Sequence, residues 1–347
     1  MGARKQGQLG VLSSAEPVVA VVIPAYRVAS HIEKVVRGVP RWVSWVVVVD
    51  DASPDDGAAI VRRLAEEDPR VVLLQNERNQ GVGGAVCRGY ARALELGADI
   101  AVKMDGDDQM DPRYLRRLIA PITRGNADYT KGNRFYHTHE LREMPAVRLI
   151  GNAALGFLVR FSSGYWNLYD PTNGYTAIHR TVLSRLRLDR LARDYFFESH
   201  MLGELGLLGA CTMDVPIPAR YGDEPSSLRI GRVMRRFPPL LLRGFLKRLW
   251  HRHLMASLSV FGLYVSVGTV LMLAGGSFGL WRWSVSFASG VPATPGTVMV
   301  AALPFMLGFI AWVQAIAVDV ASVPRLPLSL QPEPEPIDVD EDDASAG

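Results

Sequence analysis

The chain has 347 residues, of which 48% are hydrophobic, and its formal net charge at pH 7 is +3. This length is ample for one large domain plus further elements. The two cysteines, Cys87 and Cys211, lack the spacing of a zinc site or of a disulfide framework, which argues against both.

The N-terminal segment, residues 1–16, is polar and lacks the apolar core of a signal peptide. We expect this segment to be disordered. The apolar run that follows it, Val18–Ile23, is too short for a signal sequence and is typical of a buried strand.

Residues 17–228 alternate short β-branched runs with helical patterns, which predicts an α/β domain with a mostly parallel sheet. Because these strands are apolar on both faces, helices must cover the sheet on both sides. The expected strands are Val18–Ile23, Val43–Val49, Val71–Gln75 and Ile100–Met104. The expected helices lie near Ser30–Gly38, Gly57–Glu67 and Val82–Leu96.

Residues 229–253 carry eight Lys or Arg side chains and no acidic one, interleaved with leucines and aromatic residues. This pattern predicts basic amphipathic juxtamembrane helices, broken at Pro238–Pro239, that lie on an anionic lipid surface. A basic block that only fixes the membrane topology is the alternative interpretation.

Two stretches without a formal charge follow, 27 residues over Leu254–Leu280 and 22 residues over Thr297–Val318. Each exceeds the roughly 20 apolar residues that cross a bilayer core, so residues 254–323 are expected to form a two-helix transmembrane hairpin. A buried helix of a soluble protein is the alternative. The basic block before the first stretch, with only Arg282 between the two, places the N-terminal domain of this multi-pass protein in the cytoplasm. Residues 324–347 are expected to be an acidic, disordered tail.

The strongest local signal is the turn Asp105-Gly106-Asp107-Asp108-Gln109, which follows a predicted strand. Ligands of open α/β sheets bind at the loops that follow the strands. Several carboxylates in one turn repel each other unless protons or a divalent cation intervene, and such a cation also binds diphosphates. A solvated acidic turn remains the alternative.

Two more polar turns close the preceding strands. Asp50 and Asp51 end the second strand, where a carboxylate can accept a hydrogen bond from a base or ribose, or can merely cap the next helix. Pro24-Ala25-Tyr26 ends the first strand, and its tyrosine can stack on a base or pack against the domain. Three successive strands therefore deliver polar turns to one edge of the sheet.

In the order and spacing of its motifs the chain resembles the inverting family 2 glycosyltransferases of the GT-A fold, especially polyprenyl-phosphate hexosyl transferases typified by dolichyl-phosphate mannose synthase. The likeness covers roughly Val18–Arg229 and extends to the membrane hairpin. The motifs are Pro24-Ala25-Tyr26, Val49-Asp50-Asp51-Ala52-Ser53, Asn79-Gln80-Gly81-Val82-Gly83-Gly84-Ala85, Asp105-Gly106-Asp107-Asp108-Gln109, Gly132-Asn133-Arg134-Phe135 and Asp170-Pro171-Thr172-Asn173-Gly174-Tyr175.

The resemblance implies a role for each matching position. The residues implied to bind the nucleotide sugar are Pro24, Ala25, Tyr26, Asp50, Asp51, Gly84, Asp105 and Arg134. The residues implied to hold Mg²⁺ or Mn²⁺ are Asp105, Asp107 and Gln109. The candidate active-site carboxylates are Asp107, Asp170 and Glu198, although Glu198 can equally be a buried structural carboxylate. The implied acceptor-phosphate residues are Arg148, Asn152, Arg220 and Arg229.

Three departures from the family pattern stand out. Arg27-Val28 replaces the frequent Asn-Glu after the first strand, which puts one base contact in doubt. Glu224-Pro225-Ser226-Ser227 replaces Gly-x-Ser-Lys, so that Arg229 or Arg220 takes the place of the lysine. Asp108 stands where a hydrophobic residue is common, and it is either a further metal contact or an exposed bystander.

The run Gly81-Val82-Gly83-Gly84 resembles a dinucleotide-binding fingerprint but has Val86 in place of its last glycine. Its glycines instead indicate a close approach of another backbone at a helix start.

Together these features predict a metal-dependent enzyme that transfers a hexosyl group from a nucleotide-diphosphate sugar to a polyprenyl phosphate at the cytoplasmic membrane face. No nucleic-acid partner is expected, and the sequence leaves a homo-oligomer open. A processive polysaccharide synthase is an alternative, although the chain lacks Gln-x-x-Arg-Trp and has too few spans for a pore. An inactive, membrane-anchored scaffold is an alternative of another class.

Overall fold

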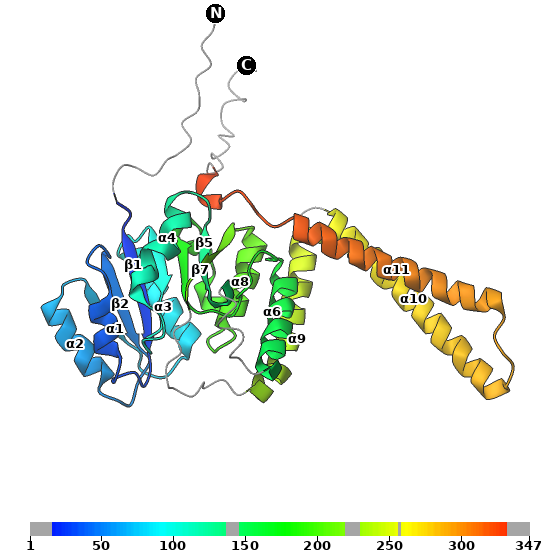
Figure 1. Ribbon diagram of the computed structural model, residues 1–347, viewed down its shortest axis with the longest axis horizontal. Helices are drawn as coiled ribbons and strands as arrows, with labels where there is room; N and C mark the ends of the chain where they lie inside the picture. The colour runs from blue at the N-terminus through cyan, green and yellow to red at the C-terminus, as the bar shows by residue number, and fades with distance from the viewer. Residues whose placement is uncertain (1–15, 137–145, 219–229, 256–257, 332–347) are drawn as a thin grey trace, which may run out of the picture.

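A computed structural model describes residues 16–136, 146–218, 230–255 and 258–331. Within these residues a seven-stranded sheet in the order β3-β2-β1-β4-β6-β5-β7 forms the centre of the N-terminal domain (Figure 1). Strand β6 runs antiparallel to both of its neighbours, and the other pairings are parallel. The strands are β1 (Val19–Ala25), β2 (Trp45–Asp50), β3 (Val71–Gln75), β4 (Ile100–Lys103), β5 (Tyr129–Asn133), β6 (Thr176–His179) and β7 (Thr212–Pro216).

Helices cover both faces of this sheet. Because successive strand residues point to opposite faces, the valines of β1 and β2 divide between two apolar clusters, one beneath α3 and α8 and the other beneath α1, α2 and α4. The predicted mostly parallel, doubly covered sheet is thereby confirmed. The helices of the domain are α1 (Ile32–Gly38), α2 (Gly57–Glu67), α3 (Val82–Glu95), α4 (Leu115–Thr123), α6 (Ala146–Ser163), α7 (Arg180–Leu183) and α8 (Phe197–Leu208). Short 3₁₀ turns are η1 (Pro112–Tyr114), η2 (Arg134–Tyr136) and η3 (Leu188–Arg190).

The basic segment forms one helix, α9 (Ile230–Arg248), which continues through Pro238 and Pro239 into a π-helical turn, η4 (Leu249–Met255). The predicted break at these prolines is therefore wrong. Phe237 and Leu241 are buried against the domain, and the Ser162 hydroxyl of α6 donates to the Leu241 carbonyl at 2.7 Å. This packing holds the helix together although two backbone donors are missing.

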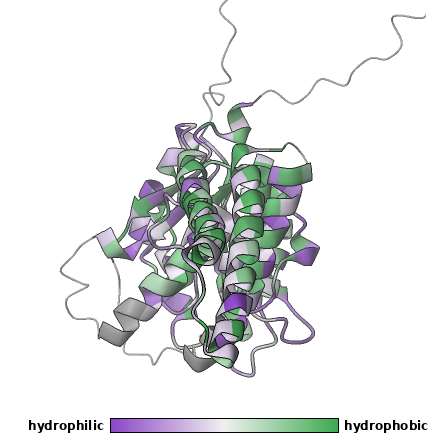
Figure 2. Ribbon diagram, turned by 90° about the vertical axis from the view of Figure 1, so that its right-hand side faces the viewer, coloured by the Kyte–Doolittle hydropathy of each residue, from purple (hydrophilic) through white to green (hydrophobic). Residues whose placement is uncertain are grey.

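Two long helices, α10 (Val260–Ser289) and α11 (Pro295–Ala321), form a hairpin that projects away from the domain (Figure 1). Both are long and apolar enough to cross a membrane, and only 28% and 6% of their most apolar windows are buried. A soluble core helix would be covered, whereas apolar residues predominate on the open surface of this hairpin (Figure 2).

Two details of the hairpin differ from the prediction. The first helix begins at Val260 rather than at Leu254, because the Ser259 hydroxyl caps it by accepting from the Gly262 N–H at 3.1 Å. Arg282 lies inside α10 rather than in the connecting loop. The helices pack closely at Gly268, where an added Cβ would lie 2.9 Å from the Gly308 carbonyl oxygen.

Residues 324–331 return to the domain, so the predicted start of a disordered tail at residue 324 is wrong. They include the 3₁₀ turn η5 (Leu328–Leu330). The buried carboxylate of Asp128 accepts from the N–H groups of Leu328 and Ser329 at 2.8 and 2.9 Å. Both ends of the hairpin therefore lie on the same side of it, next to the domain (Figure 1). The segments predicted to be disordered at residues 1–15 and 332–347 lie outside the described residues.

Candidate active site

The loops after β1, β2 and β4 meet at one edge of the sheet. Ala25 pairs with Asp50 in the parallel register of β1 and β2, and the Asp51 N–H donates to the Ala25 carbonyl at 2.9 Å. On the other side of β1, the Met104 N–H donates to the Val22 carbonyl at 3.0 Å. The acidic turn after β4 is thus adjacent to the turn after β1, and the predicted convergence of the three turns is confirmed.

Each of these loops holds one non-glycine residue with a positive φ: 58° at Arg27, 53° at Ala52 and 62° at Asp108. Such conformations are costly and persist where the surroundings enforce them. The Arg27 N–H donates to the Ser53 hydroxyl at 2.7 Å, which ties the first loop to the second. Lys34 of α1 forms an ion pair with Asp108, so Asp108 has a partner within the chain. These contacts restrain the loops at this edge of the sheet.

Asp51 is buried, and both of its carboxylate oxygens accept hydrogen bonds from the segment before α3. Oδ1 accepts from Asn76 Nδ2 at 2.6 Å and from the Gln80 N–H at 2.8 Å. Oδ2 accepts from the Gly81 N–H at 2.8 Å. Asp50 beside it is 5% exposed, and burial raises the pKa of its carboxyl. Asp51 therefore positions the loop that forms one wall of the site.

The glycines at the start of α3 admit the backbone that precedes α8. The Gly83 N–H donates to the Arg193 carbonyl at 2.8 Å, and a Cβ at Gly83 would lie 2.1 Å from the Ala192 oxygen. A Cβ at Gly84 would lie 2.7 Å from the Gln80 Cβ. The expected close backbone approach is confirmed, and its partner is the segment that leads to Glu198.

Lys103, the last residue of β4, links three parts of the site. Its side chain is 1% exposed, and Nζ lies 2.6 Å from Asp105 Oδ1 and 3.2 Å from Glu198 Oε1. Nζ also donates to the Gly174 carbonyl at 3.3 Å. Burial alone would lower the pKa of Lys103, but the charges of Asp105 and Glu198 outweigh burial and raise it. A buried ammonium thus holds two candidate carboxylates together.

A row of polar residues crosses the sheet beside this lysine. The register pairs Lys103 with Thr176, Thr176 with Lys131, and Lys131 with Asp214, so that all four share one face. Lys131 is fully buried and donates to the Asn173 carbonyl, and burial lowers its pKa to about 8. Burial raises the pKa of Asp214 to about 6. Lys103 and Lys131 therefore donate to the carbonyls of two consecutive residues, Gly174 and Asn173, and hold that loop in place.

The same loop carries Asp170, which is fully buried beneath Arg134. Arg134 Nε donates to Asp170 Oδ2 at 2.8 Å and Nη2 donates to Oδ1 at 3.1 Å, a two-point pairing. The Arg134 side chain is 39% exposed. Asp170 therefore orients a partly exposed arginine, and its own oxygens are engaged by that arginine.

In the acidic turn Gln109 is exposed and Asp107 is half-buried. Burial and the nearby charge of Asp105 raise the pKa of Asp107, and its Oδ1 accepts from the Gln109 N–H at 3.1 Å. Within the described part of the chain, no group of three or more His, Cys, Asp or Glu residues could hold a metal by itself. Asp105 and Asp107 are two carboxylates whose like charges repel each other. Such a pair suits a cation that arrives with a diphosphate, because Mg²⁺ commonly binds one or two protein carboxylates plus substrate phosphates.

The predicted nucleobase and acceptor residues are placed only in part. Tyr26 is 43% exposed beside this edge, with the Arg27 guanidinium 5.4 Å from its ring centroid. Arg148 and Asn152 both belong to α6, four positions apart. The Arg148 side chain, like Arg220 and Arg229, lies outside what the structure describes.

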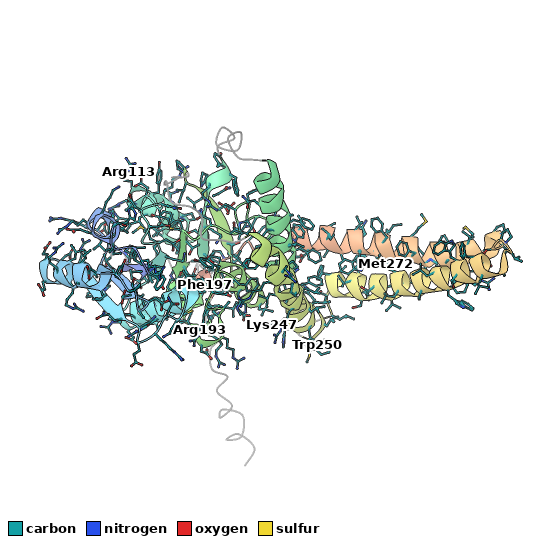
Figure 3. The ribbon with its side chains drawn as sticks, turned by 90° about the horizontal axis from the view of Figure 1, so that it is seen from below. Arg113, Arg193, Phe197, Lys247, Trp250 and Met272 are labelled. Atoms are coloured by element: carbon teal, nitrogen blue, oxygen red, sulfur yellow. The ribbon has the colours of Figure 1, made fainter. Side chains whose placement is uncertain are left out.

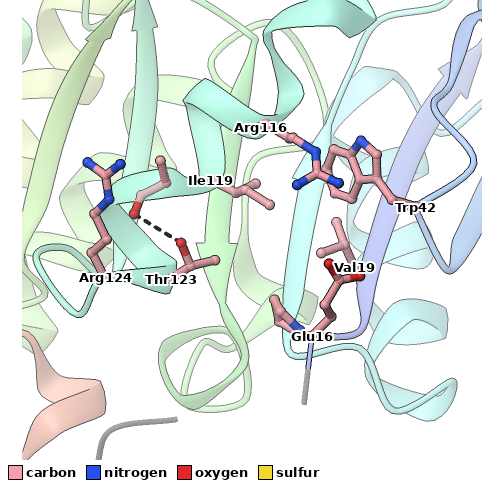
Figure 4. Close-up of a pocket in the computed structure, with 9 residues that line it drawn as sticks. Glu16, Val19, Trp42, Arg116, Ile119, Thr123 and Arg124 are labelled. Atoms are coloured by element: carbon pink, nitrogen blue, oxygen red, sulfur yellow. Dashed lines mark hydrogen bonds between the residues drawn. The ribbon is translucent and has the colours of Figure 1, made fainter. Parts of the chain in front are cut away.

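A hollow of about 290 Å³ lies elsewhere, at the start of β1 (Figure 4). Val19 and Trp42 line it, and the Arg116 guanidinium lies 4.9 Å from the Trp42 ring centroid. These residues are at the opposite end of the strands from the acidic turn. The hollow is therefore separate from the candidate active site.

Comparison with known proteins relates the chain to enzymes of sugar transfer. The model of glycosyl transferase family 2 matches residues 20–187. A UDP-N-acetylglucosamine–dolichyl-phosphate N-acetylglucosaminyltransferase of Methanococcus voltae is 31% identical over 52% of this chain and 77% of its own length. An undecaprenyl-phosphate mannosyltransferase of Micrococcus luteus is 34% identical over 50% of this chain and 70% of its own length.

Among solved structures, glucosyl-3-phosphoglycerate synthase from Mycobacterium tuberculosis, in complex with Mn²⁺, UDP and phosphoglyceric acid, has a similar fold. The TM-score is 0.50 with 20% identity, over 67% of this chain and 78% of the other. At this identity the likeness concerns the fold alone.

Proposed function

The chain belongs to glycosyl transferase family 2, and from that premise we propose that it transfers a hexosyl group from a nucleotide-diphosphate sugar to a polyprenyl phosphate. It is a glycosyltransferase related to polyprenyl-phosphate sugar transferases. The observation that carries the acceptor proposal is the attachment of an apolar hairpin to α6, the helix with Arg148 and Asn152. A lipid-linked substrate requires an active site close to the bilayer.

The donor would lie along the edge formed by the loops after β1, β2 and β4. Pro24 and exposed Tyr26 would contact the base, and the buried Ala25 and Asp51 would shape the wall behind it. Asp50 and Gly84 would contribute to that wall rather than to direct contacts, because Asp50 is buried and Gly84 lies against Gln80. The side of the site nearest the diphosphate would be formed by Asp105 and Arg134.

Asp105, Asp107 and Gln109 would hold Mg²⁺ or Mn²⁺, whose chemistry is to neutralise charge on the departing diphosphate. The residues of the chain supply the rest. The buried Lys103 holds Asp105 and Glu198 in place. Arg134, held by Asp170, adds a cation at the exposed edge of the site.

In the reaction an oxygen of the lipid phosphate attacks the anomeric carbon. The bond from that carbon to the diphosphate oxygen breaks, and the nucleoside diphosphate leaves with the electron pair. Because the attacking phosphate is already an anion, no residue has to remove a proton from it. Cationic side chains, Arg148 and Arg229 among them, would offset the repulsion between the two phosphate groups. Attack from the side opposite the leaving group inverts the anomeric configuration.

The membrane arrangement follows from the same elements. The hairpin would span the cytoplasmic membrane, with the domain on the cytoplasmic side, where basic residues concentrate. Lys247 and Trp250 project where the domain meets the hairpin, and Trp250 is 55% exposed (Figure 3). An exposed tryptophan among basic residues suits the headgroup layer of a bilayer.

A donor panel tests this proposal. The purified full chain in liposomes is given undecaprenyl phosphate and one of several UDP- or GDP-linked hexoses, and lipid products are weighed by mass spectrometry. A product heavier by one hexosyl unit with at least one donor is expected. Sugar chains of growing length would favour polysaccharide synthesis, and the absence of both transfer and donor hydrolysis would favour an inactive scaffold.

A further inference from the structure

Arg248 and Asp319 form a buried ion pair between the ends of two helices. Arg248 closes α9 and Asp319 lies in the last turn of α11, and each is 3% exposed. Arg248 Nη1 lies 2.7 Å from Asp319 Oδ1, and Nη2 lies 3.0 Å from Oδ2. A two-point pairing of this kind fixes the relative orientation of the elements that carry it.

The pair also binds the C-terminal end of α6. Arg248 Nε donates to the Ser162 carbonyl at 3.1 Å, and Nη2 donates to the Phe161 carbonyl at 2.9 Å. Trp166 Nε1, just beyond α6, donates to Asp319 Oδ2 at 2.8 Å. One arginine thus satisfies carbonyls at the end of α6 and a carboxylate of the hairpin at the same time.

The backbone beside the pair leaves room for it. Gly164 has a φ of +83°, and a Cβ there would lie 2.4 Å from Arg248 Nη1. An aromatic cluster closes the junction, with the ring centroids of Phe161 and Phe245 4.6 Å apart and those of Phe161 and Trp312 6.3 Å apart. This apolar surround keeps water from the ion pair and stiffens the junction.

The junction is one end of the helix that carries two candidate acceptor residues. Asn152 precedes Ser162 by ten positions, which is about 15 Å along an α-helix. Fixing the C-terminal end of α6 to the hairpin therefore also fixes the distance of Asn152 and Arg148 from the membrane. A second tie, from Asp128 to Leu328 and Ser329, restrains the segment that follows the hairpin.

We propose that Asp319, acting through Arg248, is a positioning residue for the lipid acceptor. It holds α6 at a set depth and angle to the hairpin, so that the phosphate of a membrane-embedded chain meets the acceptor-binding part of α6. This inference rests on the proposed function. It requires that loss of the pair harm the use of a membrane-anchored acceptor more than the use of a freely diffusing one, because only the former depends on the height of the site above the bilayer.

The experiment compares two acceptors in proteoliposomes of the full chain. One is undecaprenyl phosphate in the bilayer, and the other is a short, water-soluble prenyl phosphate added to the same vesicles. The variants are Asp319→Asn and the double variant Arg248→Met with Asp319→Leu. The double variant is needed because a single charge left buried without its partner destabilises a protein strongly, whereas removal of both is better tolerated. Asp189→Asn, which alters an exposed pair with Arg187, serves as the control.

Loss of the pair is expected to raise the KM for undecaprenyl phosphate by about tenfold or more, since small misplacements of reacting groups are costly. The KM for the short acceptor and the affinity for the nucleotide should change less than about threefold on the same reasoning. The control should match the wild type. An equal loss on both acceptors would show a merely structural role and overturn the inference, as would unchanged use of undecaprenyl phosphate by the double variant. If the wild-type chain uses neither acceptor, the proposed function fails and this inference with it.

Discussion

Lys103 Nζ lies 3.2 Å from Glu198 Oε1, so that a buried contact joins the end of β4 to the first turn of α8. The same ammonium lies 2.6 Å from Asp105 Oδ1, within the turn that follows β4. Two carboxylates from distant parts of the chain therefore share one counter-charge. This contact places Glu198 at the candidate site, and the position of Glu198 depends on Lys103.

Replacement of Lys103 by Met should abolish this arrangement. Without the ammonium, Asp105 and Glu198 repel each other in a poorly solvated place, and one of them must move. We expect transfer turnover to fall by about a hundredfold or more, the scale on which preorganised charges act in active sites. Turnover is measured with saturating donor and prenyl phosphate. Arg92→Met, which removes an exposed partner of Glu95, is the control and should retain activity. Near-normal turnover of Lys103→Met would contradict the role given to this residue.

The dependence on Lys103 could not be read from the sequence. The turn Asp105 to Gln109 stands out because several acids follow an apolar strand, and the shared edge of the loops follows from the parallel pattern. The partner of Lys103 on α8 lies 95 positions further along the chain. A lysine inside an apolar strand is itself a signal, because buried lysines need partners, but the sequence does not reveal which ones.

The fold was predictable where local patterns are strong. Strands β1 to β4 are short, mainly aliphatic runs, whereas β5 reads Tyr-Thr-Lys-Gly-Asn and β7 reads Thr-Met-Asp-Val-Pro. In these strands polar residues and the charged pair of Lys131 and Asp214 interrupt the apolar pattern, so hydrophobic periodicity does not reveal them. The return of Leu328 to Asp128 joins a backbone N–H to a side-chain carboxylate 200 positions away, and local patterns do not reveal contacts between such distant residues.

A second prediction concerns the metal. Asp107→Asn should reduce turnover by about a hundredfold, because it removes a charged ligand from the turn that would face the diphosphate. The folded domain should melt no lower than the wild type, since burial and the charge of Asp105 disfavour the ionised carboxyl of Asp107 in the fold. Turnover is measured across a titration of Mg²⁺ and of Mn²⁺. Full activity in excess chelator would reject the metal site.

A third prediction uses the buried carboxyl of Asp214, whose pKa burial raises from 3.8 to about 6. Between these values the folded state keeps a proton that the unfolded chain has lost, so the stability contributed by this group falls as the pH rises through about 6. Above that pH the fold contains a buried charge. Its Oδ1 has no hydrogen-bond partner within the described structure.

Asp214→Asn removes this ionisation and keeps an oxygen to accept from Asn133 and from the Tyr169 N–H. We therefore expect the variant to melt at a higher temperature than the wild type near pH 7.5, with the difference vanishing near pH 4. Tryptophan fluorescence during heating, in detergent at each pH, gives the two midpoints. The same shift at both pH values would be inconsistent with a titrating Asp214.

A fourth prediction concerns the glycines before α3. In Gly83→Ala the new methyl group would lie 2.1 Å from the Ala192 carbonyl oxygen and 2.9 Å from the Phe197 Cβ. The segment before α8 must then move away, and Glu198 follows it. We expect a lower melting temperature together with reduced turnover. Gly97→Ala, whose new methyl group meets nothing within 4 Å among the described residues but whose φ is +76°, should lower stability without affecting turnover of the folded enzyme.

The last prediction concerns the acceptor, on which the proposed function depends most. If a lipid phosphate is the nucleophile, arginines rather than a carboxylate base should govern its use. Arg148→Ala and Arg229→Ala should each weaken acceptor binding and leave nucleotide affinity nearly unchanged. The loss of one charge-assisted hydrogen bond costs roughly 1.5–3 kcal/mol, or about ten- to a hundredfold in apparent affinity.

Replacing the polyprenyl phosphate by the corresponding polyprenol separates the two possible chemistries. A neutral alcohol must lose a proton as it attacks, whereas the candidate carboxylates Glu198 and Asp170 are engaged by Lys103 and Arg134. Transfer to the alcohol should therefore be absent, while donor binding persists. Efficient glycosylation of the polyprenol, or of a free sugar, would refute the phosphate acceptor. It would also favour sugar-chain elongation, because that reaction attacks with a hydroxyl group and needs the base that the lipid phosphate does not.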